Sequence, residues 1–113
     1  AGVSWMDYIA GRGFDVWCLD LRGYGRSTRP PEMSQPPEAN PPLVRGETAV
    51  TDIAAASAFI RERRGISRCV HFGYSWGTAL MGRYASENPA AVERLVLYAP
   101  VWLRTTPSLA DPG

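Results

Sequence analysis

The hydrophobic residues of this chain alternate along the sequence between helical and strand spacing. Residues that recur every three or four positions predict three helices, at 4–10, from about 48 to 64, and at 76–86. Runs that are apolar at nearly every position predict three strands, at 14–19, 68–74 and 94–99. Continuous apolar runs are typical of strands covered on both faces. The alternation therefore predicts an α/β fold, with a parallel sheet of about three strands and flanking helices.

A proline-rich segment separates the first predicted strand from the second predicted helix. Six of the ten prolines lie between Thr28 and Pro42. Proline removes a backbone donor and favours polyproline II geometry, so we expect a loop here and no regular element. A ligand for a proline-binding domain is the alternative, and we favour the surface loop. We expect the charged residues 61–64 to form the solvated last turn of the second helix, stopped by Gly65, rather than a phosphate patch.

The motif Gly73-x-Ser75-x-Gly77 joins the second predicted strand to the third predicted helix. This spacing predicts a sharp turn that holds the Ser75 hydroxyl in a strained bend at a helix N-terminus. We expect that a Cβ at either glycine would collide with the closely crossing backbone. The helix N-terminus would favour a negative charge developing beside Ser75. On the pattern alone, an ordinary strand-loop-helix joint remains the alternative.

Composition and charge exclude several classes of function. The 113 residues allow one domain or part of one, and twelve basic residues oppose eleven acidic ones, so we expect no nucleic-acid or membrane-surface partner. All the basic residues are Arg, which excludes a Schiff-base lysine, and no apolar run approaches the length of a membrane span. Cys18 and Cys69 are isolated in apolar runs. We therefore expect buried, unpaired thiols, a cytoplasmic protein and no metal site.

Two loops and a strand together resemble the α/β-hydrolase family. Asp20-Leu21-Arg22-Gly23-Tyr24-Gly25-Arg26-Ser27 resembles the loop after the fourth strand, residues 73–77 resemble the nucleophile elbow, and residues 95–100 resemble the sixth strand. The resemblance covers about residues 4–102. It implies that residues 1–102 are the central part of an incomplete α/β-hydrolase domain and that residues 103–113 begin a cap.

The resemblance also separates branches of the family. Ser-Trp-Gly at the elbow, with Arg-Gly-x-Gly-Arg-Ser in the earlier loop, is similar to proline iminopeptidases. The earlier loop is equally similar to epoxide hydrolases and dehalogenases, which use an aspartate nucleophile. The serine at position 75 argues against those two branches.

Residue roles follow from the resemblance position by position. Ser75 would be the nucleophile, and the backbone N–H of Trp76 would donate to the oxyanion. Tyr24 and Trp102 each follow a predicted strand, at the sheet edge where α/β proteins bind ligands, so we expect them to line an apolar acyl pocket; plain core packing is an equal alternative for Trp102. We expect a small acyl substrate and no cofactor. The residues expected to brace the site structurally are Asp20, Arg22, Gly23, Gly25, Gly73 and Gly77.

A serine hydrolase of this family needs further groups that the sequence does not provide. The order in the family is Ser, then an acid, then His, with a second oxyanion donor from an earlier loop. After Ser75 the acids are Glu87, Glu93 and Asp111, and no histidine follows. His71 precedes Ser75 by four residues, about 13 Å along an extended strand, so we expect a buried structural role for it.

Three functional hypotheses follow. The first is a serine hydrolase of the esterase or aminopeptidase type, active only as a full-length protein. The second is a non-catalytic hydrolase-like fragment or binding scaffold. A dinucleotide or phosphate site at Gly23-Tyr24-Gly25 is disfavoured, because no third glycine follows and the next segment is proline-rich. We also expect the 113 residues alone to be poorly stable or prone to aggregation, because the first strand would lack a neighbour.

Overall fold

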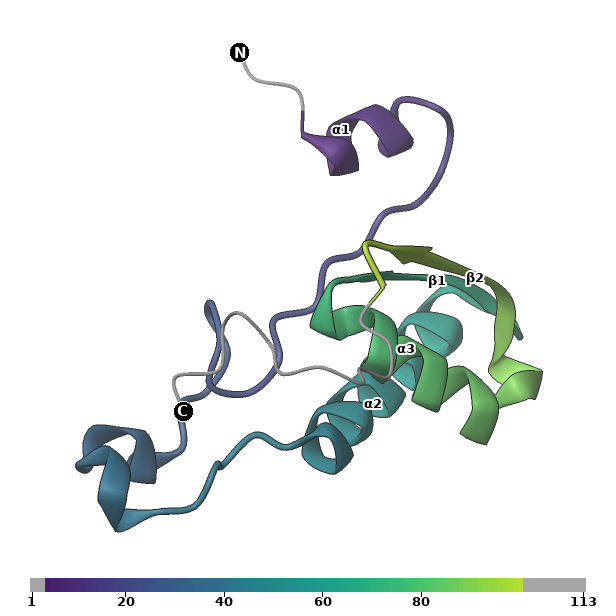
Figure 1. The fold of residues 1–113 in the computed structure, drawn as a ribbon. Helices are drawn as coiled ribbons and strands as arrows, with labels where there is room; N and C mark the ends of the chain where they lie inside the picture. Colours follow the sequence, from purple (N-terminus) through teal and green to yellow (C-terminus); the bar gives the residue numbers. More distant parts are fainter. Residues whose placement is uncertain (1–3, 101–113) are drawn as a thin grey trace.

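The computed structural model describes residues 4–100 of the chain. Helices and strands alternate from residue 46 onward, as the sequence predicts (Figure 1). In chain order the α-helices and strands are α1 (Trp5–Ala10), α2 (Gly46–Arg64), β1 (Cys69–Tyr74), α3 (Trp76–Glu87) and β2 (Val92–Tyr98). Three short 3₁₀-helices are η1 (Pro31–Ser34), η2 (Pro37–Ala39) and η3 (Pro89–Ala91).

The described sheet has two parallel strands joined by α3. β1 and β2 pair from Cys69 opposite Val92 to Tyr74 opposite Tyr98, with an irregularity between Cys69 and Val70. Both α2 and α3 lie on one side of this sheet, and α1 lies on the other (Figure 1). A strand, a helix and a second parallel strand form the βαβ unit of an α/β fold, which confirms the predicted fold class.

The core lies between the two long helices and the sheet. Small residues on α2 let α3 approach closely, and Gly65 ends α2 in the left-handed conformation with φ 63°. Tyr84 of α3 is almost completely buried. The core consists of Ala49, Val50, Ile53, Leu80, Tyr84, Ala91 and Val92.

The charged last turn of α2 differs from its prediction at one residue. Arg63 and Arg64 are exposed, as expected, but Arg61 is half-buried. Its Nε has no hydrogen-bond partner among the residues that the structure describes, although Nη1 donates to the Ser67 carbonyl at 3.4 Å. The turn is therefore only partly solvated.

The strand predicted at 14–19 does not form. No strand lies beside this segment in the described part of the chain, and an unpaired segment has no ladder of hydrogen bonds to hold it as a strand. The segment instead contacts α2, where Asp15 pairs with Arg64 at 2.6 Å and the Trp17 ring meets Phe59. Cys18 is consequently exposed, against its prediction, while Cys69 is half-buried. Both cysteines are unpaired, as expected.

The proline-rich segment is more ordered than predicted. Two 3₁₀-helices, η1 and η2, interrupt the expected loop, and each begins at a proline, Pro31 or Pro37. Proline fits the first position of a helical turn because the N–H that it lacks would have no acceptor there. The prediction of a segment without regular elements was therefore wrong.

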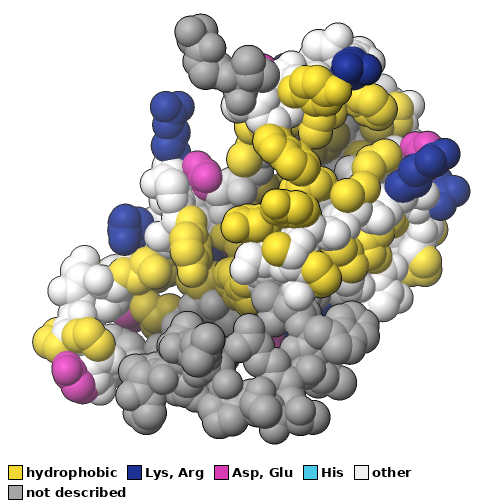
Figure 2. Space-filling model, turned by 45° about the horizontal axis from the view of Figure 1, so that its top comes forward, with side chains coloured by type: hydrophobic (Ala, Val, Ile, Leu, Met, Phe, Trp, Pro, Cys, Tyr) yellow, Lys and Arg dark blue, Asp and Glu magenta, His cyan; other side chains and the backbone are white. Residues whose placement is uncertain are grey.

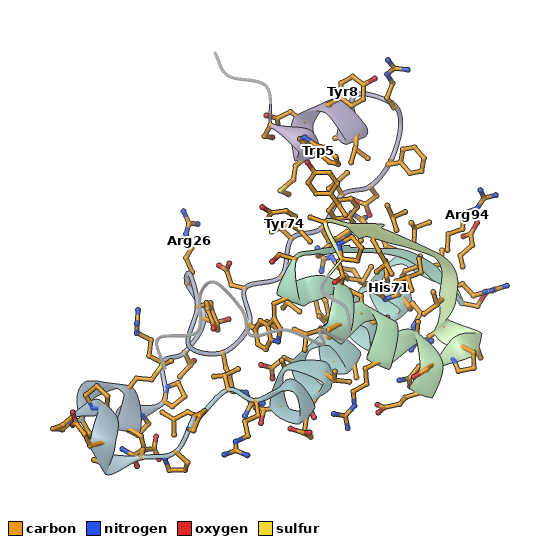
Figure 3. All side chains as sticks on the ribbon, viewed as in Figure 1. Trp5, Tyr8, Arg26, His71, Tyr74 and Arg94 are labelled. Atoms are coloured by element: carbon orange, nitrogen blue, oxygen red, sulfur yellow. The ribbon has the colours of Figure 1, made fainter. Side chains whose placement is uncertain are left out.

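One face of the sheet is turned away from α2 and α3. Because paired residues of parallel strands share a face, this outer face carries Val70, Phe72, Tyr74, Arg94, Val96 and Tyr98. Trp5 of α1 covers part of it, with its ring centroid 5.6 Å from that of Phe72 and 5.5 Å from that of Tyr98 (Figure 3). Figure 2 shows hydrophobic side chains gathered over this side of the molecule.

Candidate active site

Ser75 occupies the single residue between the end of β1 and the start of α3. It has φ 51° and ψ −119°, a conformation that residues with a Cβ rarely adopt. Its N–H donates to the Tyr98 carbonyl at 3.1 Å, and its own carbonyl accepts from the Thr78 N–H at 2.9 Å. The residue is exposed. The sharp strand-to-helix turn predicted from the sequence is therefore present, with the serine at its apex.

The two glycines of the motif have different surroundings. A Cβ built at Gly73 would lie 2.5 Å from the Gly77 carbonyl oxygen and 2.9 Å from the Thr78 Cα, so only glycine fits there. A Cβ at Gly77 would meet nothing within 4 Å. The expected collision is confirmed at Gly73 and wrong at Gly77, because the crossing backbone approaches the first glycine only.

The backbone N–H of Trp76 lies at the N-terminus of α3. It belongs to the first helical residue, so it has no acceptor within its helix. The partial positive charge of the helix N-terminus acts in the same place. These groups can stabilise an anion beside Ser75, which is what a tetrahedral acyl intermediate requires.

The loop at 20–27 is a closed turn braced by Asp20. The Asp20 carboxylate accepts from the Arg26 N–H at 3.0 Å, and its carbonyl accepts from the Ser27 hydroxyl at 2.6 Å. Gly25 has φ 49°, and a Cβ there would collide with the Asp20 carboxylate. Gly23 has φ 84°, and a Cβ there would lie 2.7 Å from Met33 Cε. The structure thus gives these residues contacts that hold the loop.

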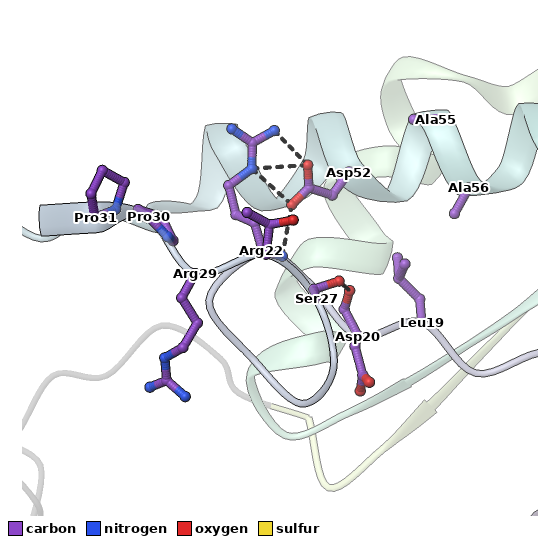
Figure 4. A pocket seen from close by; sticks show the side chains of 11 residues that line it. Leu19, Asp20, Arg22, Ser27, Arg29, Pro30, Pro31, Asp52, Ala55 and Ala56 are labelled. Atoms are coloured by element: carbon purple, nitrogen blue, oxygen red, sulfur yellow. Dashed lines mark hydrogen bonds and ion pairs between the residues drawn. The ribbon is translucent and has the colours of Figure 1, made fainter. Parts of the chain in front are cut away.

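Arg22 ties this loop to α2. Its guanidinium makes a two-pronged ion pair with Asp52, Nη2 to Oδ1 at 2.6 Å and Nε to Oδ2 at 3.1 Å (Figure 4). The Arg22 backbone N–H also donates to the Asp52 carboxylate at 3.1 Å. These hydrogen bonds lower the pKa of Asp52 below its ordinary value and raise the pKa of Arg22. Sequence reasoning missed Asp52, because thirty residues separate the partners and no local spacing marks them.

The hollow in Figure 4 lies between residues 19–31 and α2, with a volume of about 540 Å³. Its polar lining includes Arg22, Asp52 and Asp20, and its apolar lining includes Ala55 and Ala56. Ser75 is not among its lining residues. We therefore place the candidate chemistry at the exposed turn around Ser75 and not in this open hollow.

Tyr24 is brought to the Ser75 turn by the 20–27 loop. Its ring centroid lies 6.4 Å from that of Trp76, with the planes tilted by 42°. Both side chains are partly exposed. The sequence indicated Tyr24 as a pocket residue, but the side chain of Trp76 was not considered beside it, since only its backbone N–H had a predicted role.

His71 points to the helix side of the sheet. It is buried, with Nε2 3.3 Å from the Ser57 Oγ, Nδ1 3.1 Å from the Cys69 carbonyl oxygen, and its ring 5.0 Å from that of Tyr84. Burial lowers the pKa of His71 below its ordinary value of 6.5. The buried position predicted for His71 is confirmed, and the structure gives it no contact with Ser75.

The described acids after Ser75 lie at the other end of the sheet. Glu87 ends α3 and pairs with Arg83 at 2.8 Å, and Glu93 is the second residue of β2. Ser75 follows the last residue of β1, so neither acid is placed beside it. Asp111 and Trp102 lie outside the described residues. Within residues 4–100, no group of three or more His, Cys, Asp or Glu side chains could hold a metal ion.

The sequence matches a family model for the alpha/beta hydrolase fold over residues 2–111. The chain therefore belongs to the alpha/beta hydrolase fold family. The βαβ unit with a strained serine between strand and helix is consistent with that membership. No helix between residues 4 and 100 combines the length and the apolar character needed to cross a membrane.

Three curated proteins illustrate what this chain is similar to. It is 33% identical to the abhydrolase domain-containing protein abhd-5.2 of Caenorhabditis elegans, over 75% of this chain and 17% of that protein. It is 32% identical to a proline iminopeptidase of Neisseria gonorrhoeae, over 74% and 23% respectively. It is 23% identical to the bifunctional epoxide hydrolase 2 of Sus scrofa, over 95% and 18%. The chain thus spans about a fifth of the length of these relatives. No solved structure matches it.

Proposed function

We propose that Ser75 is the nucleophile of a serine hydrolase that cleaves an ester or amide bond in a small acyl substrate. The observation that carries the proposal is the backbone of Ser75, exposed and held at φ 51° between β1 and α3. Strain of this kind persists only where surrounding contacts impose it, and it clusters at functional sites. Likeness to a proline iminopeptidase supports a hydrolase that attacks a carbonyl.

In the proposed reaction, the Ser75 hydroxyl oxygen attacks the carbonyl carbon of the substrate as a base removes its proton. The Trp76 N–H donates to the oxyanion that forms. Collapse of this intermediate breaks the bond to the alcohol or amine, which leaves with the proton that the base returns, and the acyl group stays on Ser75. Water then releases the acid by the same route. The base, its acidic partner and a second oxyanion donor are not found among residues 4–100, so the proposal places activity in the full-length protein.

Labelling by a fluorophosphonate tests this proposal, since such probes react with activated serines. The full-length protein is expected to be labelled, and Ser75→Ala is expected to abolish the label. Ser67→Ala removes another exposed hydroxyl and serves as the matched control, which should label like the wild type. Labelling of Ser75→Ala at the wild-type rate would refute the role of Ser75 as the nucleophile.

A non-catalytic hydrolase-like scaffold is the second candidate. It is supported by the position of His71, which is bonded to Ser57 and Cys69 on the helix side of the sheet. For the 113-residue chain by itself this is the function that we favour. Ester turnover by the purified chain, lost in Ser75→Ala, would contradict it.

Esterase and aminopeptidase activities are both compatible with this nucleophile. The iminopeptidase relative favours an aminopeptidase, and an aminopeptidase would also need acidic groups for the free amine. Comparing turnover of an aminoacyl anilide with that of a simple ester by the full-length protein separates the two activities.

A further inference from the structure

The loop at 20–27 presents the Tyr24 side chain on a fixed backbone. The Tyr24 N–H donates to the Leu21 carbonyl at 2.9 Å, and its carbonyl accepts from the Ser27 N–H at 3.0 Å. Gly23 and Gly25 on either side have positive φ, so the chain folds tightly around this residue. The backbone of Tyr24 is thus held while its side chain is 52% exposed.

The exposed ring of Tyr24 faces the aromatic side chain next to the proposed nucleophile. Its contact is with Trp76, at 6.4 Å between centroids, and Trp76 is itself 39% exposed. Trp76 directly follows Ser75 at the start of α3, so the backbone of the turn anchors this apolar pair of rings next to the serine in the chain. We name this pair of rings the Tyr24–Trp76 wall.

The Tyr24–Trp76 wall differs from three other exposed aromatic side chains of the molecule. Tyr8, Phe59 and Trp17 each have an arginine guanidinium over the ring, at 4.8, 6.0 and 5.4 Å. In the described part of the chain, no guanidinium covers Tyr24 or Trp76. Arg26 belongs to the same loop, but its side chain points away from the fold (Figure 3). Among the described residues, the two rings are therefore exposed without a cation over them.

We propose that Tyr24 is a specificity-determining residue, selecting substrates whose acyl group carries a flat, apolar ring. This inference rests on the proposed function of Ser75. Two tilted rings can pack a third ring in an edge-to-face or offset arrangement, which adds to the burial of apolar area. A short alkyl acyl group would reach less of this surface and gain less from it.

Two esters that differ only in the acyl group test the inference on the full-length protein. The probes are p-nitrophenyl phenylacetate and p-nitrophenyl acetate, which share one leaving group. Removing an apolar contact from a pocket lowers kcat/KM by about tenfold or more, so Tyr24→Ala should do this for the phenylacetate, mainly through KM. The kcat/KM of Tyr24→Ala for the acetate should change by less than about twofold. Tyr24→Phe keeps the ring, so its kcat/KM for both esters should also change by less than about twofold.

Tyr8→Ala is the matched control, because Tyr8 on α1 is also exposed and belongs neither to the 20–27 loop nor to the Tyr24–Trp76 wall. It should leave the ratio of the two esters unchanged. Fluorophosphonate labelling of Tyr24→Ala at the wild-type rate verifies that its active site is folded. If Tyr24→Ala is not labelled, Tyr24→Leu repeats the comparison of the two esters, because leucine keeps an apolar side chain without a flat face.

Equal loss with both esters, or no loss with either, would overturn the role of Tyr24 while labelling of Ser75 still supports the hydrolase. A loss in Tyr24→Ala that depends on a protonated amine in the acyl group and not on its ring would overturn the proposed ring chemistry, since aromatic faces also attract cations. Absence of Ser75 labelling would overturn the proposed function and this inference together.

Discussion

The backbone conformation of Ser75 is strained, and the contacts of the surrounding turn hold it in place. A non-glycine residue in a sparsely populated conformation costs roughly 1–3 kcal/mol. We predict that Ser75→Gly is more stable to urea than Ser75→Ala by about 1 kcal/mol, because both lose the hydroxyl but only glycine relieves the strain at φ 51°. The comparison uses the full-length protein. Equal unfolding midpoints for the two variants would show that the turn is unstrained.

The two elbow glycines form a natural pair for substitution by alanine. Gly73→Ala places a Cβ against the Gly77 backbone, so we predict a loss of about 1–3 kcal/mol or more in the free energy of unfolding. Gly77→Ala meets open space inside a helix and should be neutral or stabilising by up to about 1 kcal/mol. Urea denaturation measures both. Similar losses at the two positions would contradict this geometry.

At this scale the sequence predicted the turn but not its contacts. The Gly73-x-Ser75-x-Gly77 spacing was sufficient to place a serine between strand and helix, because the motif itself encodes a local backbone path. The spacing did not distinguish the crowded Gly73 from the uncrowded Gly77, since crowding depends on which part of the backbone passes close to each glycine. The ring of Trp76 beside Tyr24 was missed for the same reason: fifty-two residues separate them, and no spacing encodes the contact.

At the scale of elements, the Arg22–Asp52 pair holds the 20–27 loop on α2. Side chains of the pair are 47% and 16% exposed, so we discount the interaction to about 1 kcal/mol. We predict that Asp52→Asn lowers the free energy of unfolding by about that amount at neutral pH. Glu38→Gln, at an exposed acid of η2, is the control and should change little.

The difference in unfolding free energy between wild type and Asp52→Asn depends on pH, because the pKa of Asp52 is lowered in the folded state. Its ordinary value is 3.8, and the folded value is lower, so the folded state keeps the carboxylate charged after the unfolded state has bound a proton. The contribution of the pair is complete above about pH 5 and is lost as the pH falls below about 4. Urea melts of wild type and Asp52→Asn should therefore converge in acid. A constant difference down to pH 3 would be incompatible with this linkage.

His71 links α2, α3 and β1 through a buried ring. Burial, together with the positive charge of Arg61, lowers the pKa of His71 below 6.5. The unfolded state therefore binds a proton first as the pH falls, so the contribution of His71 is present above pH 6.5 and is lost below it. We predict a loss of up to about 1.4 kcal/mol for each pH unit below this value.

The variant His71→Gln tests this prediction because it removes the titrating group and keeps a polar side chain. Its stability relative to wild type, measured by the urea midpoint, should be nearly constant between pH 8 and about pH 7 and should improve as the pH falls below about 6.5. Parallel profiles for the two proteins would mean that the imidazole accepts a proton as readily folded as unfolded.

Elements were predictable where their stabilising contacts are local or periodic. The spacing of Val50, Ile53 and Ser57 placed the buried face of α2, and Gly65 placed its end. The apolar run at 14–19 carried an equally clear pattern, yet formed no strand, because a strand also needs a neighbour that hydrophobic spacing cannot supply. Cys18 was predicted buried through the same error.

At the scale of the whole molecule, the sheet has one covered face and one face that residues 4–100 leave largely open. Parallel sheets are normally covered on both sides, yet Trp5 shields only part of the outer face. Val96 on this face is 44% exposed, whereas Val50 in the core is 5% exposed. Exposed apolar surface and unpaired strand edges favour association between chains. The 113-residue chain expressed by itself should therefore associate and lack a cooperative thermal transition.

Two isosteric substitutions separate this surface effect from a general loss of stability. Val96→Thr keeps a β-branched residue in the strand and makes the outer face more polar, so it should reduce association measured by light scattering. Val50→Thr buries an unpaired hydroxyl between the helices, so it should increase association. A cooperative melt of the wild-type chain as a soluble monomer would contradict the prediction. Equal effects of the two substitutions would show that the outer face does not drive association, because only Val96→Thr changes that face.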